Sequence, residues 1–94
     1  MRIERLIWLD EIIEKLAKKH GVLQDEVREV LEGKSIFRFV EKGHRSGENV
    51  YAAMGQTQSG RYLIIFFILK KKRDALVLSA REMTRAERKR YEKG

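Results

Sequence analysis

Residues 62–69 read YLIIFFIL, an unbroken run of apolar and aromatic side chains. A run of this length, rich in branched and aromatic residues, is typical of a central β-strand that is covered on both faces. A turn-forming segment, GQTQSG at 55–60, precedes the run, and the charged segment KKKRD at 70–74 follows it. The run therefore predicts the middle strand of a sheet whose neighbouring strands are reached through tight turns.

Other segments on both sides of this run also have strand character. Residues 35–41, 49–54 and 75–80 are rich in branched and aromatic side chains and are separated by polar turns. Together with 61–69 they predict four successive strands, which is the pattern of an antiparallel meander. Residues 2–8 alternate over a shorter distance and predict a possible short N-terminal strand.

Two helices are expected between the first strand and the meander. From Leu9 to Ala17 apolar residues recur at helical spacing, with acidic side chains early and basic ones late, as the helix dipole favours. Gly21 is expected to end this helix, and a second apolar face begins at Leu23 and ends at Gly33. The pattern predicts two N-terminal helices joined by a glycine turn.

A third helix is expected at the C-terminal end. Thr84 and Glu87 have the spacing of a capping box, which predicts a short basic helix from Arg85 to about Lys93. The order of elements predicts an α+β fold, with two N-terminal helices packed on a four-stranded antiparallel sheet and a short C-terminal helix. We expect one domain over residues 1–94. If the other sheet face is only partly covered, side chains from several strands can converge on it.

Composition excludes several classes of site. The chain has no cysteine, so disulfides, thiolate zinc sites and iron–sulfur clusters are excluded. The two histidines lie 24 residues apart, at 20 and 44, and the closest acidic residues lie on a solvated helix start, so we expect no metal site and no bound cofactor. The longest apolar run is far shorter than a membrane span, and no signal-peptide pattern opens the chain, so we expect a cytoplasmic protein without membrane contact.

Positive charge is concentrated near the C-terminal end. The sequence holds 21 lysines and arginines against 14 aspartates and glutamates, a formal net charge of +7. Residues 1–40 carry no net charge, residues 41–69 carry +1 and residues 70–94 carry +6. This distribution indicates a polyanion or an acidic protein as partner. A solvated charged helix beside a lysine-rich turn is the alternative explanation, and composition fits both.

The residues best suited to phosphate chemistry lie after the last predicted strand. Arg81 follows that strand, and Arg85 lies in the first helical turn, where free backbone amides favour phosphate. Guanidinium groups bind phosphate oxygens through two parallel hydrogen bonds. The alternative is that these arginines form surface ion pairs with neighbouring glutamates. His44 lies in a glycine-flanked loop, and histidine side chains commonly act as general acid or base.

Four short motifs occur in order along the chain: KHGV at 19–22, GQT at 55–57 with GRYL at 60–63, SAREMT at 79–84 and ERKRYE at 87–92. On these motifs, from about residue 5 to residue 93, the chain resembles the BrnT family of bacterial type II toxins. The resemblance implies a fold related to the RelE ribonucleases and a metal-independent endoribonuclease activity that inhibits translation. It also implies a cognate BrnA-like antitoxin of the ribbon-helix-helix class, through which alone the complex would contact DNA.

Taken together, these features favour RNA cleavage in which the ribose 2′-hydroxyl attacks the adjacent phosphate. Two sets of candidates follow. The catalytic candidates are Arg81, Arg85 and Arg61 as phosphate-binding cations, His44 or Glu82 as general base, and Tyr91 or His44 as general acid. The RNA-binding candidates are Lys70, Lys71, Lys72, Arg73, Arg45 and Arg88, with Tyr51 or Tyr62 as a base-stacking ring. A non-catalytic basic binding module and a gyrase-directed toxin of the same superfamily remain the alternatives.

Overall fold

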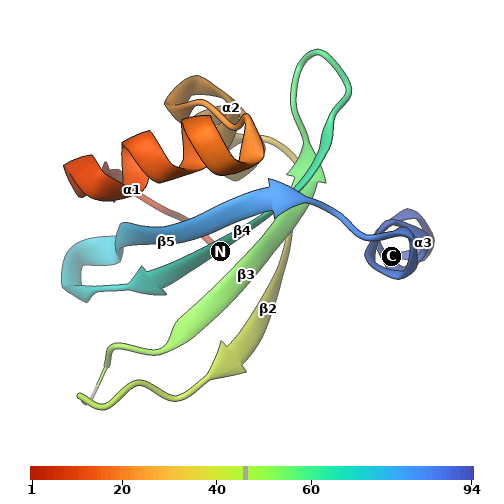
Figure 1. The fold of residues 1–94 in the computed structure, drawn as a ribbon. Coiled ribbons are helices and arrows are strands. Elements are labelled where there is room, and N and C mark those ends of the chain that lie inside the picture. The colour runs from red at the N-terminus through yellow and green to blue at the C-terminus, as the bar shows by residue number, and fades with distance from the viewer. Residues whose placement is uncertain (46) are drawn as a thin grey trace.

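The computed structural model describes residues 1–45 and 47–94 and has three helices and a single sheet among them (Figure 1). The strands are β1 (Arg5–Ile7), β2 (Ile36–Glu41), β3 (Val50–Gln56), β4 (Tyr62–Leu69) and β5 (Asp74–Glu82). The helices are α1 (Asp10–Lys15), α2 (Gln24–Glu32) and α3 (Arg85–Lys93). The α+β class is confirmed. None of the described helices is long and apolar enough to cross a membrane.

The sheet has five strands in the order β1-β5-β4-β3-β2 and is mixed. Strands β2 to β5 form the predicted antiparallel meander, and β4 lies at its centre. The four predicted antiparallel strands and the possible N-terminal strand are all present, but β1 joins the same sheet at the edge of β5 in parallel, so the sheet is five-stranded and mixed and not four-stranded and antiparallel. Arg5 pairs there with Asp74, whose carboxylate oxygen lies 3.0 Å from the guanidinium.

Helices α1 and α2 cover one face of the sheet (Figure 1). Alternate residues of β4, Leu63, Ile65 and Phe67, are completely buried on this face, and Val27 and Val30 of α2 belong to the same core cluster. The alternation follows from the two-residue period of a strand. Burial of β4 at the middle of this core is what its sequence predicts.

The two N-terminal helices are confirmed in position, although the first changes its geometry along its length. After Lys15 the chain continues as a π-helical turn over Leu16–His20, and Gly21 ends it with a left-handed φ of +62°. Glycine takes this conformation without the steric cost that a Cβ atom imposes. The turn brings Val22 into the core, where it is almost completely buried.

Helix α3 packs against the opposite face of the sheet and covers only part of it. Ala52, Met54 and Ile64 form a second buried cluster on this face, against which Tyr91 of α3 and Met83 pack. Figure 1 shows α3 set apart from α1 and α2, beyond the end of β5 where the chain leaves the sheet. The sheet thus has one face covered by two helices, except at the β2 edge where Phe39 is 59% exposed, and one face covered in part by α3.

Candidate active site

Helix α3 begins with the predicted capping box, which is confirmed. The hydroxyl oxygen of Thr84 accepts a hydrogen bond from the backbone N–H of Glu87 at 3.2 Å, and Oε1 of Glu87 accepts one from the backbone N–H of Thr84 at 2.8 Å. These two bonds satisfy donors that have no partner within the helix. They also fix the carboxylate of Glu87 close to the end of β5.

Arg81 of β5 uses this carboxylate as its partner. Its Nη1 lies 2.8 Å from Oε1 of Glu87 and its Nη2 lies 3.0 Å from Oε2, which is a bidentate pair. Nη1 also donates to the backbone oxygen of Glu82 at 3.1 Å, and the guanidinium carbon lies 5.7 Å from the centre of the Phe66 ring. Arg81 is therefore held in one orientation from three directions.

The pair between Arg81 and Glu87 shifts the pKa of both groups. Hydrogen bonding to Arg81 lowers the pKa of Glu87 from 4.5 to about 2, against the opposing effect of burial, and the backbone N–H of Thr84 adds to this decrease. Hydrogen bonding to Glu87 raises the pKa of Arg81. Both side chains are thus charged at neutral pH, and their charges largely cancel each other.

Arg81 keeps a second binding edge. A guanidinium has five N–H donors. Arg81 makes three hydrogen bonds to its neighbours, two from Nη1 and one from Nη2. Within the described part of the chain, neither the Nε–H group nor the second hydrogen of Nη2 has a partner. These two parallel groups can donate to two oxygens of a phosphate or carboxylate in bidentate geometry, and the side chain is 34% exposed.

Arg61 lies at the same end of the sheet but is engaged by carboxylates. Its Nη1 lies 2.8 Å from Oε2 of Glu26 on α2, its Nη2 lies 3.2 Å from Oε2 of Glu82, and Nη1 also donates to the backbone oxygen of Gly21. Hydrogen bonding to Glu26 raises the pKa of Arg61. Two carboxylates against one guanidinium give a local negative charge, so this geometry does not support the predicted role of Arg61 as a third phosphate-binding cation.

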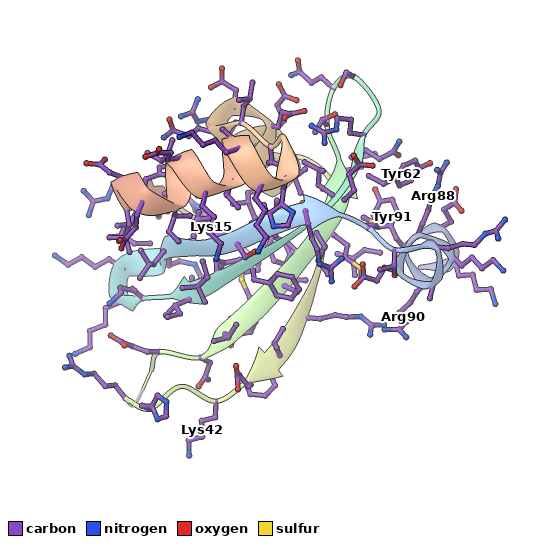
Figure 2. The ribbon with its side chains drawn as sticks, in the orientation of Figure 1. Lys15, Lys42, Tyr62, Arg88, Arg90 and Tyr91 are labelled. Carbon is purple, nitrogen blue, oxygen red and sulfur yellow. The ribbon has the colours of Figure 1, made fainter. Side chains whose placement is uncertain are left out.

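The exposed side of α3 carries the two other predicted cations of this end, Arg85 and Arg88. Arg85, Arg88 and Lys89 line a depression of about 430 Å³ together with Thr84 and Glu92. Arg88 lies directly over the ring of Tyr62, with its guanidinium carbon 3.8 Å from the ring centre. Figure 2 shows Arg88, Tyr62 and Tyr91 gathered on one side of α3, with Arg90 on the other side.

The aromatic residues proposed to stack an RNA base are engaged within the protein. One side of the Tyr62 ring is covered by Arg88, and its edge contacts Tyr91 at a centroid distance of 5.9 Å. Tyr51 stacks on Phe67 at 6.0 Å on the helix-covered face. These contacts favour the alternative that both tyrosines serve in packing.

The structure does not bring His44 to these arginines. His44 and Arg45 lie in the connection between β2 and β3, at the end of the sheet that also carries the turn from β4 to β5. Arg81 lies opposite Ile64, and the far end of β4 is at Leu69, which is about 17 Å away at the usual rise per strand residue. His44 therefore cannot reach a phosphate that is bound at Arg81.

The basic turn lies at the same distant end. Lys70 pairs with Glu48 at 3.0 Å, and Nε of Arg73 donates to the backbone oxygen of Arg2 at 2.7 Å. Lys71, Lys72 and Arg73 are exposed, and Lys72 and Arg73 both have a left-handed φ of +62°. Figure 2 places Lys42, in the neighbouring connection, far from α3. The predicted candidates thus separate into an arginine end, with α3, and a lysine end.

The family of the chain is shown by a match over most of its length. A sequence-family model described as "Ribonuclease toxin, BrnT, of type II toxin-antitoxin system" matches residues 8–87. The chain belongs to the BrnT family. The fold agrees with this: it is similar to the crystal structure of the Brucella abortus ribonuclease toxin BrnT, with a TM-score of 0.60 and 17% identity, over 86% of this chain and 97% of that chain. No sequence of a curated protein matches the chain.

Within this BrnT-family chain, sequence reasoning found the cations of the arginine end but missed Glu26 as a site residue. Glu26 lies 35 residues before Arg61, and no local pattern indicates the contact. Glu87 was predicted only as a cap and as a surface partner, whereas it orients Arg81. Among the described residues, no three histidine, aspartate or glutamate side chains converge in a way that could hold a metal ion.

Proposed function

We propose that this BrnT-family chain is a metal-independent endoribonuclease, the toxin of a type II toxin–antitoxin pair, which cleaves RNA and thereby inhibits translation in the cytoplasm. The observation that carries the proposal is the second binding edge of Arg81. It is an arginine fixed by Glu87, with two parallel N–H donors that no described residue engages. Arg85, Arg88 and Lys89 line a depression on α3, the helix that carries Glu87. A preorganised donor pair of this kind stabilises charge that develops in a transition state.

In the proposed reaction the ribose 2′-oxygen attacks the adjacent phosphorus and the bond from phosphorus to the 5′-oxygen breaks. The products are a 2′,3′-cyclic phosphate and a 5′-hydroxyl. Nε and Nη2 of Arg81 would bind the two non-bridging oxygens, which gain negative charge as the attack proceeds. Arg85, at the first turn of α3, would bind the neighbouring phosphate.

Glu82 is not retained as the general base. It follows Arg81 along β5 and lies opposite Leu63, so its side chain leaves the sheet on the α2 face, where Nη2 of Arg61 donates to one of its oxygens at 3.2 Å. Arg61 and Glu82 thus join the end of β5 to Glu26 of α2. Tyr91 of α3, whose ring contacts that of Tyr62 on β4, is the proposed acid for the departing 5′-oxygen. His44 is not retained in either role because of its distance from Arg81.

The RNA backbone is proposed to extend from the arginine end, where Arg88 binds, toward the lysine end. Lys71, Lys72 and Arg73 at the exposed turn, and Arg45 in the neighbouring loop, would bind phosphates without reading sequence. Lys70 contributes less because Glu48 holds it. The partner that restrains this activity is proposed to be a BrnA-like ribbon-helix-helix antitoxin, and DNA would be contacted through that antitoxin alone.

The test is cleavage of an RNA oligonucleotide by the purified protein in excess EDTA. We expect cleavage to proceed and the 5′ fragments to end in 2′,3′-cyclic phosphate or 3′-phosphate, since internal attack needs no metal ion. Cleavage that requires an added divalent ion, or fragments with 3′-hydroxyl ends, would refute the mechanism. RNA binding without any cleavage would instead favour the non-catalytic module.

A further inference from the structure

The sheet face that carries α3 is left open over half of its length. The strand register places Phe66 and Ile68 of β4 on this face, beside Leu76 and Ser79 of β5. Val50 of β3 lies opposite Ile68 on the same face. All five side chains are only half-buried, whereas Ile64, under α3, is buried. We call Val50, Phe66, Ile68, Leu76 and Ser79 the open platform.

The open platform is a continuous apolar surface and not a set of isolated side chains. Ile68 pairs with Leu76 on one side and with Val50 on the other, so three apolar residues cross three adjacent strands in one row. Phe66 and Ser79 form the next row toward α3. Neighbouring apolar side chains that keep part of their surface in contact with solvent form a candidate interaction site.

Two guanidinium groups beside the open platform have N–H donors that no described residue engages. Arg38 of β2 lies opposite Ala52 at one side of it and is exposed. Arg81 lies on the α3 side, with its guanidinium carbon 5.7 Å from the centre of the Phe66 ring, and its second binding edge has no partner among the described residues. At the far side the carboxylate of Asp74 is paired with Arg5, and Glu41 lies at the end of β2, opposite Val50. An apolar surface with arginines at two sides is complementary to an apolar segment that carries carboxylates.

We infer that the open platform is the docking surface of the antitoxin, which would lay an amphipathic acidic segment across β3, β4 and β5. The apolar side chains of this segment would pack on Ile68 and Leu76, and its carboxylates would pair with Arg38 and with the second binding edge of Arg81. This inference rests on the proposed function, because that function supplies the antitoxin as partner. Docking in this position would block the phosphate site directly.

The observations favour a protein segment over RNA as the occupant. The surface that RNA phosphates need is cationic and polar, and the basic side chains of the lysine end and of α3 provide it. Burying Ile68 and Leu76 is favourable when apolar groups of the partner cover them, and the apolar side chains of a protein segment supply such groups. A protein interface with an apolar centre and a charged rim has this composition.

The experiment measures binding of the purified protein to the purified product of the adjacent antitoxin reading frame. Leu76→Lys places a charge at the centre of the open platform, and we expect the dissociation constant to increase about thirtyfold or more. Leu23→Lys is the matched control, because Leu23 is 59% exposed at the start of α2 on the other side of the sheet. We expect the control to change the constant by less than about twofold.

Arg38→Glu tests the charge complementarity in a second variant. Arg38 is exposed and makes no ion pair within the described residues, so this variant is expected to fold even if Leu76→Lys does not. We expect about tenfold weaker binding, mostly through a slower association rate that loses its dependence on salt. RNA cleavage by Arg38→Glu and by Leu76→Lys is measured separately, and we expect both to stay within about twofold of the parent protein.

Three outcomes would overturn the inference. The first is unchanged antitoxin binding in Leu76→Lys and Arg38→Glu. The second is a loss of RNA binding in both variants with antitoxin binding intact, which would make the open platform an RNA surface. The third is a parent protein that is dimeric and becomes monomeric in Leu76→Lys, with antitoxin binding retained, which would make it a self-association surface. Failure of RNA cleavage in the parent protein would contradict the proposed function alone.

Discussion

Replacing Glu87 with glutamine tests whether one carboxylate holds α3 to the sheet. Glutamine keeps the size of the side chain and an oxygen that can accept from the backbone N–H of Thr84. It removes the negative charge that Arg81 contacts through two hydrogen bonds of 2.8 and 3.0 Å. We expect Glu87→Gln to destabilise the protein and to loosen α3 first, because Glu87 joins the first turn of α3 to Arg81 of β5.

The magnitude follows from the pKa of Glu87. A pKa lowered from 4.5 to about 2 corresponds to about 3 kcal/mol of stability at neutral pH, at 1.36 kcal/mol per pKa unit. Arg81 is 34% exposed, so solvent screening reduces the expected loss to about 2 kcal/mol. Because the pKa is lower in the folded state, this stability is present above pH 4.5 and is lost as the pH falls from about 4.5 to about 2.

The assay is urea unfolding followed by far-UV circular dichroism at pH 7 and at pH 3. We expect Glu87→Gln to cost about 2 kcal/mol at pH 7 and much less at pH 3, because the parent protein has then lost most of the same contribution. Hydrogen exchange should show faster exchange in α3 than in β4. Glu92→Gln is the control, since Glu92 lies 3.8 Å from Arg88 with both side chains about half exposed, and it should cost at most about 0.5 kcal/mol.

Two results would refute this reasoning. If Glu87→Gln and Glu92→Gln have equal effects at pH 7, the bidentate pair does not stabilise the fold beyond an ordinary surface pair. If the stability difference between the parent protein and Glu87→Gln is the same at pH 7 and pH 3, the charge of Glu87 is not its source.

Three further predictions follow from single contacts. Arg61→Ala should lower the free energy of unfolding by about 1 to 2 kcal/mol in urea titration, because it leaves the half-buried carboxylate of Glu26 without its cation, whereas equal stability would show that Arg61 does not tie α2 to the sheet. Lys72→Gly should raise the melting temperature by a few degrees, because Lys72 has a φ of +62° that glycine adopts without strain, and a lower melting temperature would contradict this. Lys71→Ala should weaken RNA binding modestly and reduce the salt dependence by about one phosphate contact, with turnover unchanged, and a loss of turnover would place the turn at the reacting phosphate.

Much of the fold could be predicted because most of its elements are indicated by short stretches of neighbouring residues. The apolar run at 62–69 identifies the central strand, and the capping box at Thr84 locates α3 within one residue. The parallel pairing of β1 could not be found in this way. Arg5 and Asp74 are 69 residues apart, and a strand of three residues carries too little periodicity to indicate its partner.

The candidate site was only partly predictable for a similar reason. The sequence indicates that cations gather after β5, but whether a guanidinium faces a carboxylate or a ligand depends on contacts between distant elements, as Arg61 and Glu26 show. The separation of His44 from Arg81 was available from topology alone. In an antiparallel meander successive turns alternate between the two ends of the sheet, so the loop before β3 and the end of β5 must lie at opposite ends.

The central claim is that the second binding edge of Arg81 acts on the reacting phosphate. The most direct test is the single-turnover rate of RNA cleavage at saturating protein in EDTA. Arg81→Lys keeps a positive charge next to Glu87 but removes the second pair of donors, whereas Glu87→Gln loosens α3 and keeps the arginine. We predict that Arg81→Lys lowers the rate about a hundredfold with RNA affinity within several-fold, and that Glu87→Gln stays within about tenfold of the parent rate. A parallel loss in both variants, or a full rate in Arg81→Lys, would contradict the claim and leave the pair with a structural role only.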